Sequence, residues 1–106
     1  MNKRILIILC LALSLTACQK LEVKREYYPD GKLMVEKFVR GRKAVNKVYH
    51  ASGKLIGVYE YKDGTLNGVS TIYNNEGELF KKIKYVNGKQ VDVKFFGSRG
   101  EVLFDL

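Results

Sequence analysis

The chain has 106 residues, with 19 Lys and Arg against 11 Asp and Glu, a formal charge of +8, two Cys, one His and ten Gly. This length allows one small domain, and 46% apolar with 28% charged residues excludes both a disordered tail and a polytopic membrane protein. Two cysteines cannot build a disulfide framework, and one histidine excludes His-pair mechanisms and most zinc sites.

Residues 1–17 have the layout of a secretory signal peptide. Lys3 and Arg4 give it a basic start, and an uncharged run extends from Ile5 to Ala17. As a helix this run would span about 20 Å, which is shorter than the ~30 Å hydrocarbon core of a bilayer. We therefore predict a helical signal peptide and not a permanent transmembrane helix.

The signal ends in the tetrapeptide Leu15, Thr16, Ala17 and Cys18. This tetrapeptide resembles the lipobox of bacterial lipoproteins, in which the peptide is cleaved before the Cys, the sulfur is diacylglycerated and the new N-terminus is acylated. The resemblance implies cleavage between Ala17 and Cys18, lipidation of Cys18, and a lipidated N-terminus with a short linker over residues 18–24. An ordinary signal peptide with a chance cysteine is the alternative.

The lipobox resemblance also implies a location in the cell envelope, where the lipid anchor makes the membrane a partner. Gln19 follows the cysteine, and in Gram-negative relatives only Asp at that position argues strongly for retention in the inner membrane. We therefore expect the outer membrane, at its periplasmic face or at the surface, if the host is Gram-negative.

The remaining chain, residues 25–106, is built on a repeat. In one register four glycines each have an aromatic residue four positions before and an aliphatic residue two positions after. These glycines are spaced 22, 24 and 23 residues apart: Gly31, Gly53, Gly77 and Gly100. In a second, interleaved register three glycines each have an aromatic residue three positions before: Gly41, Gly64 and Gly88.

Each of these glycines stands where a tight reversal needs a positive φ, and Asp63-Gly64 and Asn87-Gly88 are strong hairpin signals. Runs of six to eight residues rich in Val, Ile, Tyr and Phe separate the turns. We predict an all-β domain, an antiparallel meander of about eight short strands. Seven aromatic residues are expected to stack as its core: Tyr27, Phe38, Tyr49, Tyr61, Tyr73, Tyr85 and Phe96.

The repeat resembles the MORN repeat in its bacterial variant, most clearly in GVYEYKDGTLNG at residues 57–68. Two features depart from the family pattern: Trp is absent, and Val45 and Asp92 stand where the best repeat has Gly68. The resemblance implies MORN-like β-hairpin repeats without catalytic residues, in proteins associated with scaffolding and with protein or phospholipid contacts. Bacterial variants are often labelled YwqK-type antitoxin components, which implies an antitoxin or immunity role but no particular partner.

We find no catalytic constellation, because the polar residues that stand out all belong to turn positions: Asp30, His50, Ser52, Asp63, Glu76 and Ser98. No carboxylate pair, metal-ligand cluster or phosphate-binding glycine loop is present in the sequence. We expect no enzymatic activity, no cofactor, no metal and no small-molecule substrate. Nucleic acid is also disfavoured, because the exported compartment offers little and because tyrosines in a core cannot stack bases.

The positive charge is unevenly distributed along the chain. Residues 18–54 have ten basic and four acidic side chains, whereas residues 55–106 have seven of each. Basic residues beside the anchor would attract anionic headgroups, although a solvated surface that keeps strand edges soluble explains them equally well. The candidate contacts with an anionic surface are Lys24, Arg25, Arg40, Arg42, Lys43 and Lys47.

These observations favour a lipid-anchored, non-enzymatic module that presents a β-repeat surface to an unknown protein partner in the envelope. The second hypothesis is a membrane-surface module whose basic half lies on anionic phospholipid. An antitoxin or immunity role is the third, and it depends on the family resemblance alone.

Overall fold

The computed structural model describes residues 19–105, so the predicted signal peptide and Cys18 lie outside the described residues. The described residues form nine strands: β1 Leu21–Tyr27, β2 Leu33–Arg40, β3 Lys43–Tyr49, β4 Leu55–Lys62, β5 Thr65–Leu66, β6 Gly68–Tyr73, β7 Leu79–Val86, β8 Lys89–Phe96 and β9 Val102–Asp105. This part of the chain contains no helix, and so none long and apolar enough to cross a bilayer.

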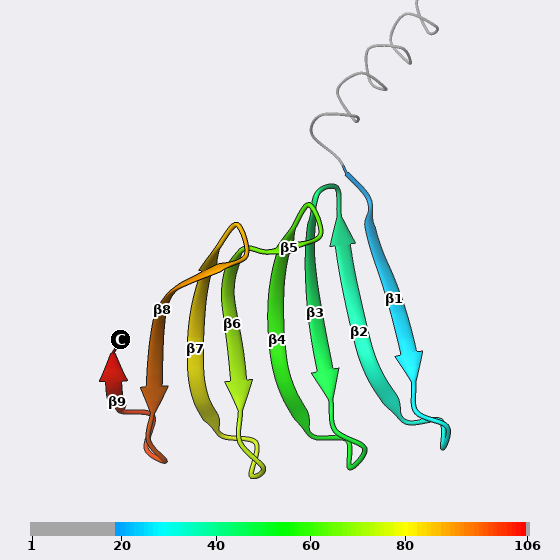
Figure 1. Ribbon diagram of the computed structural model, residues 1–106. Coiled ribbons are helices and arrows are strands. Elements are labelled where there is room, and N and C mark those ends of the chain that lie inside the picture. Colours follow the sequence, from blue (N-terminus) through cyan, green and yellow to red (C-terminus); the bar gives the residue numbers. More distant parts are fainter. Residues whose placement is uncertain (1–18, 106) are drawn as a thin grey trace, which may run out of the picture.

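The strands form one antiparallel sheet, in which successive strands lie side by side (Figure 1). Eight strands follow one another in the order β1-β2-β3-β4-β6-β7-β8-β9, and the two-residue β5 pairs with β4. The predicted all-β meander is confirmed, with one short strand more than the eight we expected.

The first strand begins at Leu21, inside the segment 18–24 that we assigned to a linker. It pairs with β2 from Leu21 opposite Arg40 to Tyr27 opposite Leu33. β2 offers backbone donors and acceptors along its whole length, and the extra residues of β1 satisfy them. The sheet therefore extends further toward the N-terminus than predicted.

Four turns with the same hydrogen bonds join the strands at one end of the sheet, and we call them the lower turns: residues 28–32, 50–54, 74–78 and 97–101 (Figure 1, bottom). In each, the first residue donates its N–H to the carbonyl oxygen of the fifth, at 2.7–2.8 Å. The glycine in fourth place donates to the carbonyl oxygen of the first, at 2.8–3.0 Å. All four glycines have a positive φ, as predicted.

Three shorter turns at the opposite end, the upper turns, contain Gly41, Gly64 and Gly88 (Figure 1, top). Asp63 and Gly64 have φ values of 52° and 77°, and Asn87 and Gly88 have 49° and 83°. Positive φ at both central residues is the requirement of the type I′ turn, whose twist matches that of the strands it joins. The Asp-Gly and Asn-Gly signals therefore act as predicted.

The predicted aromatic core is not what the structure contains. Among the described residues the buried side chains are Ile83, Val93 and Ser70, which lie opposite one another on β7, β8 and β6. We call this side of the sheet the core face. Ser70 is 1% exposed, and its hydroxyl has no hydrogen-bond partner among the described residues.

The seven aromatic residues that we assigned to the core are half-buried, except Tyr27, which is 55% exposed. The aromatic ring pair in the described residues joins Phe80 and Phe95, with centroids 5.7 Å apart and planes at 74°, and neither belongs to that set. The reason is architectural, because a single sheet without a second layer cannot cover large rings on both sides.

The first prediction concerns the upper turn at Gly64. A Cβ at this position would meet no atom within 4 Å, so the cost of a substitution comes from the φ of 77° alone. Gly64→Val should lower the free energy of unfolding by about 2 kcal/mol, because a β-branched residue is strained in this region. Urea denaturation measures the change; Ser98→Ala in an exposed lower turn is the control, and equal losses would contradict the turn assignment.

Candidate functional site

The upper end of the sheet carries a group of cations that we call the basic edge. Arg40 of β2 lies opposite Lys43 of β3, and Lys43 lies opposite Lys62 of β4. Together with Gln19 and Arg42 these side chains line a hollow of about 380 Å³. Like charges directly opposite one another on a sheet are destabilising, so the basic edge would be relieved by an anionic partner.

Arg42 is already engaged by a neighbouring upper turn. Its guanidinium donates two hydrogen bonds to the Asp63 carboxylate, at 2.7 and 2.6 Å, and the N–H of Asp63 donates to the Arg42 carbonyl oxygen at 2.7 Å. The hydrogen bond from Arg42 lowers the pKa of Asp63, and the same contact raises the pKa of Arg42. Arg42 therefore joins two adjacent hairpins, which leaves Arg40, Lys43 and Lys62 as the cations of the basic edge without an ion pair in residues 19–105.

The structure separates the other three predicted contacts from the basic edge. Arg25 forms an ion pair with Glu36 at 2.9 Å. The ammonium of Lys47 lies 5.4 Å from the centroid of the Phe38 ring. Lys24 lies opposite Lys37, one position along β1 from Arg25 and hence on the other face. Of the six candidates, the structure brings Arg40, Arg42 and Lys43 together.

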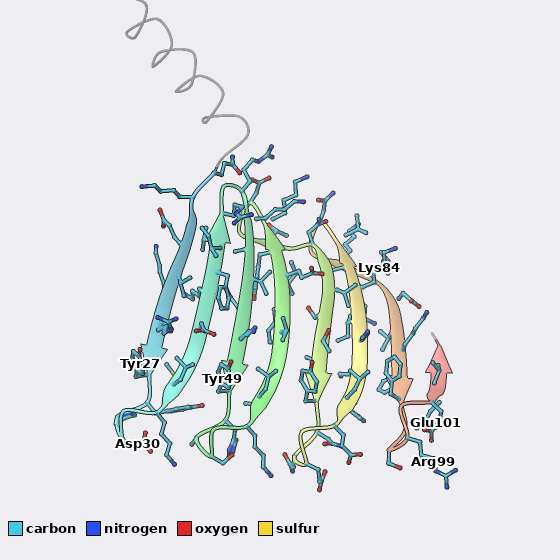
Figure 2. All side chains as sticks on the ribbon, turned by 180° about the vertical axis from the view of Figure 1, so that it is seen from behind. Tyr27, Asp30, Tyr49, Lys84, Arg99 and Glu101 are labelled. Atoms are coloured by element: carbon cyan, nitrogen blue, oxygen red, sulfur yellow. The ribbon has the colours of Figure 1, made fainter. Side chains whose placement is uncertain are left out.

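A second basic group was missed by our division of the chain into halves. Lys82, Lys84 and Lys94 surround a hollow of about 260 Å³ with Val69 and Asp92, and we call it the lysine hollow. Figure 2 labels Lys84.

Equal numbers of charges in residues 55–106 concealed the lysine hollow. Three acidic residues of that segment lie in the lower turns, away from these lysines: Glu76, Glu78 and Glu101. Part of the negative charge of this segment is therefore distant from the lysine hollow, although the segment is neutral as a whole.

The basic edge and the lysine hollow lie on the same face of the sheet, which we call the basic face. Lys43 and Lys47 are four residues apart on β3 and so share a face. From Lys47 the pairing continues across neighbouring strands through Val58, Thr71, Lys82 and Lys94.

A further hollow of about 410 Å³ lies between the second and third lower turns and is lined by His50, Lys54 and Tyr73 among others. At the corresponding position of the first turn, Tyr28 donates its hydroxyl to the Tyr49 carbonyl oxygen at 2.7 Å. His50 bonds within its own turn instead, accepting the N–H of Ser52 at its Nδ1 at 3.1 Å. His50 thus occupies a turn position, as expected from the sequence.

The described residues contain no group of three or more His, Cys, Asp or Glu side chains that could hold a metal ion. Burial raises the pKa of Tyr59, and the neighbouring Tyr61 and Tyr85 raise it further. A raised pKa keeps this phenol neutral and unsuited to act as a base at neutral pH.

Residues 23–39 and 44–63 match the model of the MORN repeat variant family. These two segments of the chain are therefore similar to the MORN repeat variant. The first matched segment lies on β1 and β2, and the second on β3 and β4, so that one MORN-variant repeat corresponds to one hairpin. The hairpins β6–β7 and β8–β9 lie beyond the matched residues but repeat the hydrogen bonds of the lower turns.

No curated protein matches this chain. Among solved structures, the crystal structure of TarM is 12% identical over 92% of this chain and 20% of its own, with a TM-score of 0.59. A mutant of S. aureus TarM in complex with Fondaparinux, alpha-GlcNAc-glycerol and UDP is 11% identical over 92% of this chain and 21% of its own, with a TM-score of 0.60. The chain spans about a fifth of these proteins, and the likeness shows the fold alone.

The second prediction concerns the pair of Arg42 and Asp63. Because the folded-state pKa of Asp63 is lowered, its contribution to stability is present above the unfolded-state pKa near 3.9 and is lost as the pH falls through the folded-state value. Asp63→Asn should therefore be less stable than the wild type at pH 7, with a difference that shrinks toward pH 3. Asn tolerates the positive φ at this position, so the substitution isolates the charge.

Denaturant unfolding at a series of pH values measures this difference. Arg42→Gln should reproduce the effect of Asp63→Asn, and combining the two substitutions should add little. A difference between Asp63→Asn and wild type that stays constant from pH 7 to pH 3 would contradict the assigned interaction.

Proposed function

We propose that this protein is a lipid-anchored, non-enzymatic MORN-variant module that presents its sheet to a protein partner in the cell envelope. The observation that supports this proposal most is the exposure of the repeat sheet. Ile83 and Val93 are the only buried apolar side chains among the described residues, so both faces of a single layer are accessible. Such a sheet offers an extended surface, which suits recognition of a macromolecule.

The lipid anchor is supported by the lipobox resemblance of residues 15–18. An acylated Cys18 would hold the sheet at a membrane surface, because each buried CH₂ of the acyl chains contributes about 0.8 kcal/mol. Attachment also raises the local concentration of the module near envelope partners.

The third prediction tests the anchor. Cys18→Ala should leave an uncleaved precursor that takes up no acyl label, because the thiol that receives the lipid is missing. Metabolic labelling with a radioactive fatty acid and the mass of the protein on a gel measure both effects. Cys10→Ala, which removes the other cysteine, is the matched control and should be processed normally.

Normal processing of Cys18→Ala would refute the lipoprotein proposal. The partner proposal is tested in the same envelopes after chemical cross-linking. The wild-type chain should capture one protein reproducibly, and Gly64→Val, which disturbs an upper turn, should capture less of it. Equal capture by both would indicate that the folded sheet does not carry the interaction.

The basic edge supports a second candidate function, contact with anionic phospholipid. Gln19, one residue after the lipidation position, lines the same hollow as Arg40, Lys43 and Lys62. An anchor at Cys18 would therefore bring these cations close to the headgroups. Each Lys or Arg near an anionic surface contributes about 1 kcal/mol, and salt screens this attraction.

The fourth prediction separates this candidate from a protein partner. Residues 19–106 produced without the signal peptide and without Cys18, which cannot be lipidated, should bind phosphatidylglycerol vesicles more tightly at low than at high salt. Lys43→Ala combined with Lys62→Ala should weaken this binding by about 30-fold. Lys32→Ala combined with Arg99→Ala removes the same charge from the lower turns and should have a much smaller effect. Binding that is absent, or insensitive to salt, would refute the membrane-surface function.

A further inference from the structure

The two edges of the sheet differ in their protection against pairing with another chain. β9 closes one edge with four residues, and short edge strands are one of the devices that prevent association. β1 forms the other edge with seven residues, contains no proline, and is irregular only between Glu26 and Tyr27. Every residue of β1 is exposed, and Leu21 and Val23 are 50% and 39% exposed. β1 therefore presents an open row of backbone donors and acceptors.

The side chains of β1 and of the residue before it alternate in charge. Lys20, Glu22, Lys24 and Glu26 are two residues apart and so point to one face of the strand. The neighbouring strand neutralises only the last of them, because Lys37 contacts Glu26 at 3.3 Å. Glu22 lies opposite Val39 and Lys24 lies opposite Lys37. Within residues 19–105 neither Glu22 nor Lys24 forms an ion pair.

We propose that β1 pairs with β1 of a second copy of this chain, antiparallel and centred on Val23. In this register Val23 meets its own counterpart on the two-fold axis. Glu22 of one copy lies opposite Lys24 of the other, and Lys20 lies opposite Glu26, so the symmetry gives four cross-strand pairs of opposite charge. The proposal depends on the edge and its charges and is independent of the proposed function.

Neighbouring registers are disfavoured by the same charges. Centring the pair on Lys24 places Lys24 opposite itself and Glu22 opposite Glu26. Centring it on Glu22 places Glu22 opposite itself and Lys20 opposite Lys24. Like charges directly opposite each other are unfavourable, so the alternation selects the Val23 register. A strand with lysine at every second position would repel its own copy, whereas this strand is complementary to itself.

The fifth prediction is a cross-linking test of the register. In an antiparallel pair, opposite Cα atoms lie about 4.5–5.5 Å apart, within the range that a disulfide spans. Val23→Cys in the full chain should therefore form a disulfide-linked dimer on mild oxidation. Leu21→Cys is the matched control, since its two copies would be four positions apart, about 13 Å. The unmodified chain, oxidised in parallel, reports any background from Cys10 and Cys18.

Charge exchange tests the same register without cysteines. Glu22→Lys and Lys24→Glu should each weaken self-association about tenfold, because each turns two attractive pairs into repulsive ones. The two single variants mixed together should associate again, and so should the chain that carries both substitutions. Chemical cross-linking of the full chains, followed by the dimer fraction on a gel, measures each case.

Three results would overturn the proposal. Equal cross-linking of Val23→Cys and Leu21→Cys would indicate random contact. Failure of the mixed variants to associate would exclude the Val23 register. Association of the mixture would also show that both single variants are folded, because each must pair with the other. A Val23→Cys adduct with the mass of a different protein would assign the edge to another partner.

Discussion

The structure depends on a single constraint, the reversal of the chain at glycines with positive φ in the four lower turns. Each turn closes through the same two backbone hydrogen bonds, and the bonds fix which residues of the adjoining strands lie opposite one another. Repetition of the turn at intervals of 22–24 residues places equivalent residues of successive hairpins next to each other. The hydrogen bond from Tyr28 to Tyr49 and the ion pair of Arg42 with Asp63 each join residues 21 positions apart. Local turn chemistry thus determines the contacts between repeats.

A single-layer sheet built in this way buries few side chains and distributes its stability over many weak contacts. Within residues 19–105 the main contacts of each strand are with the strands beside it, as in other repeat proteins. Long side chains cover part of the surface, as Lys47 does over the ring of Phe38. The buried Ser70 hydroxyl has no hydrogen-bond partner within residues 19–105, and burial of such a group costs free energy. Exposure of both faces is therefore inherent in the architecture.

The sequence predicted the turns correctly, because interactions within a few residues determine them. All seven turn glycines have the expected positive φ, because Asp-Gly, Asn-Gly and the repeated aromatic-to-glycine spacing act within a few residues. Short-range patterns could not predict how far Tyr27 and the other aromatic residues are buried, because burial depends on whether a second layer packs on the sheet. The sequence also did not predict a strand over Leu21–Lys24. Pairing with β2, and not the hydrophobic pattern of these residues, makes the segment extended.

The basic edge illustrates the same limit. Arg40, Arg42 and Lys43 were selected because they lie in the basic half of the sequence, whereas Lys62 was left in the neutral half. The pairing of Lys43 with Lys62 follows only once the register of the β3–β4 hairpin is known, including the irregularity at Val48 and Tyr49. A tally of charges along a meander conceals clusters, because consecutive strands return to the same edge of the sheet.

The inferred pairing through β1 has a geometric consequence for membrane contact. A two-fold axis between antiparallel edge strands is perpendicular to the sheet, so the upper turns of one copy lie beside the lower turns of the other. The two basic edges then point in opposite directions, and a membrane in contact with both must lie along a face of the sheet. The same axis keeps the basic faces of both copies on one side. Lys43, Lys62, Lys82 and Lys94 of each copy would therefore form one continuous surface, and pairing would double the number of cations that a single anionic membrane or acidic partner could meet.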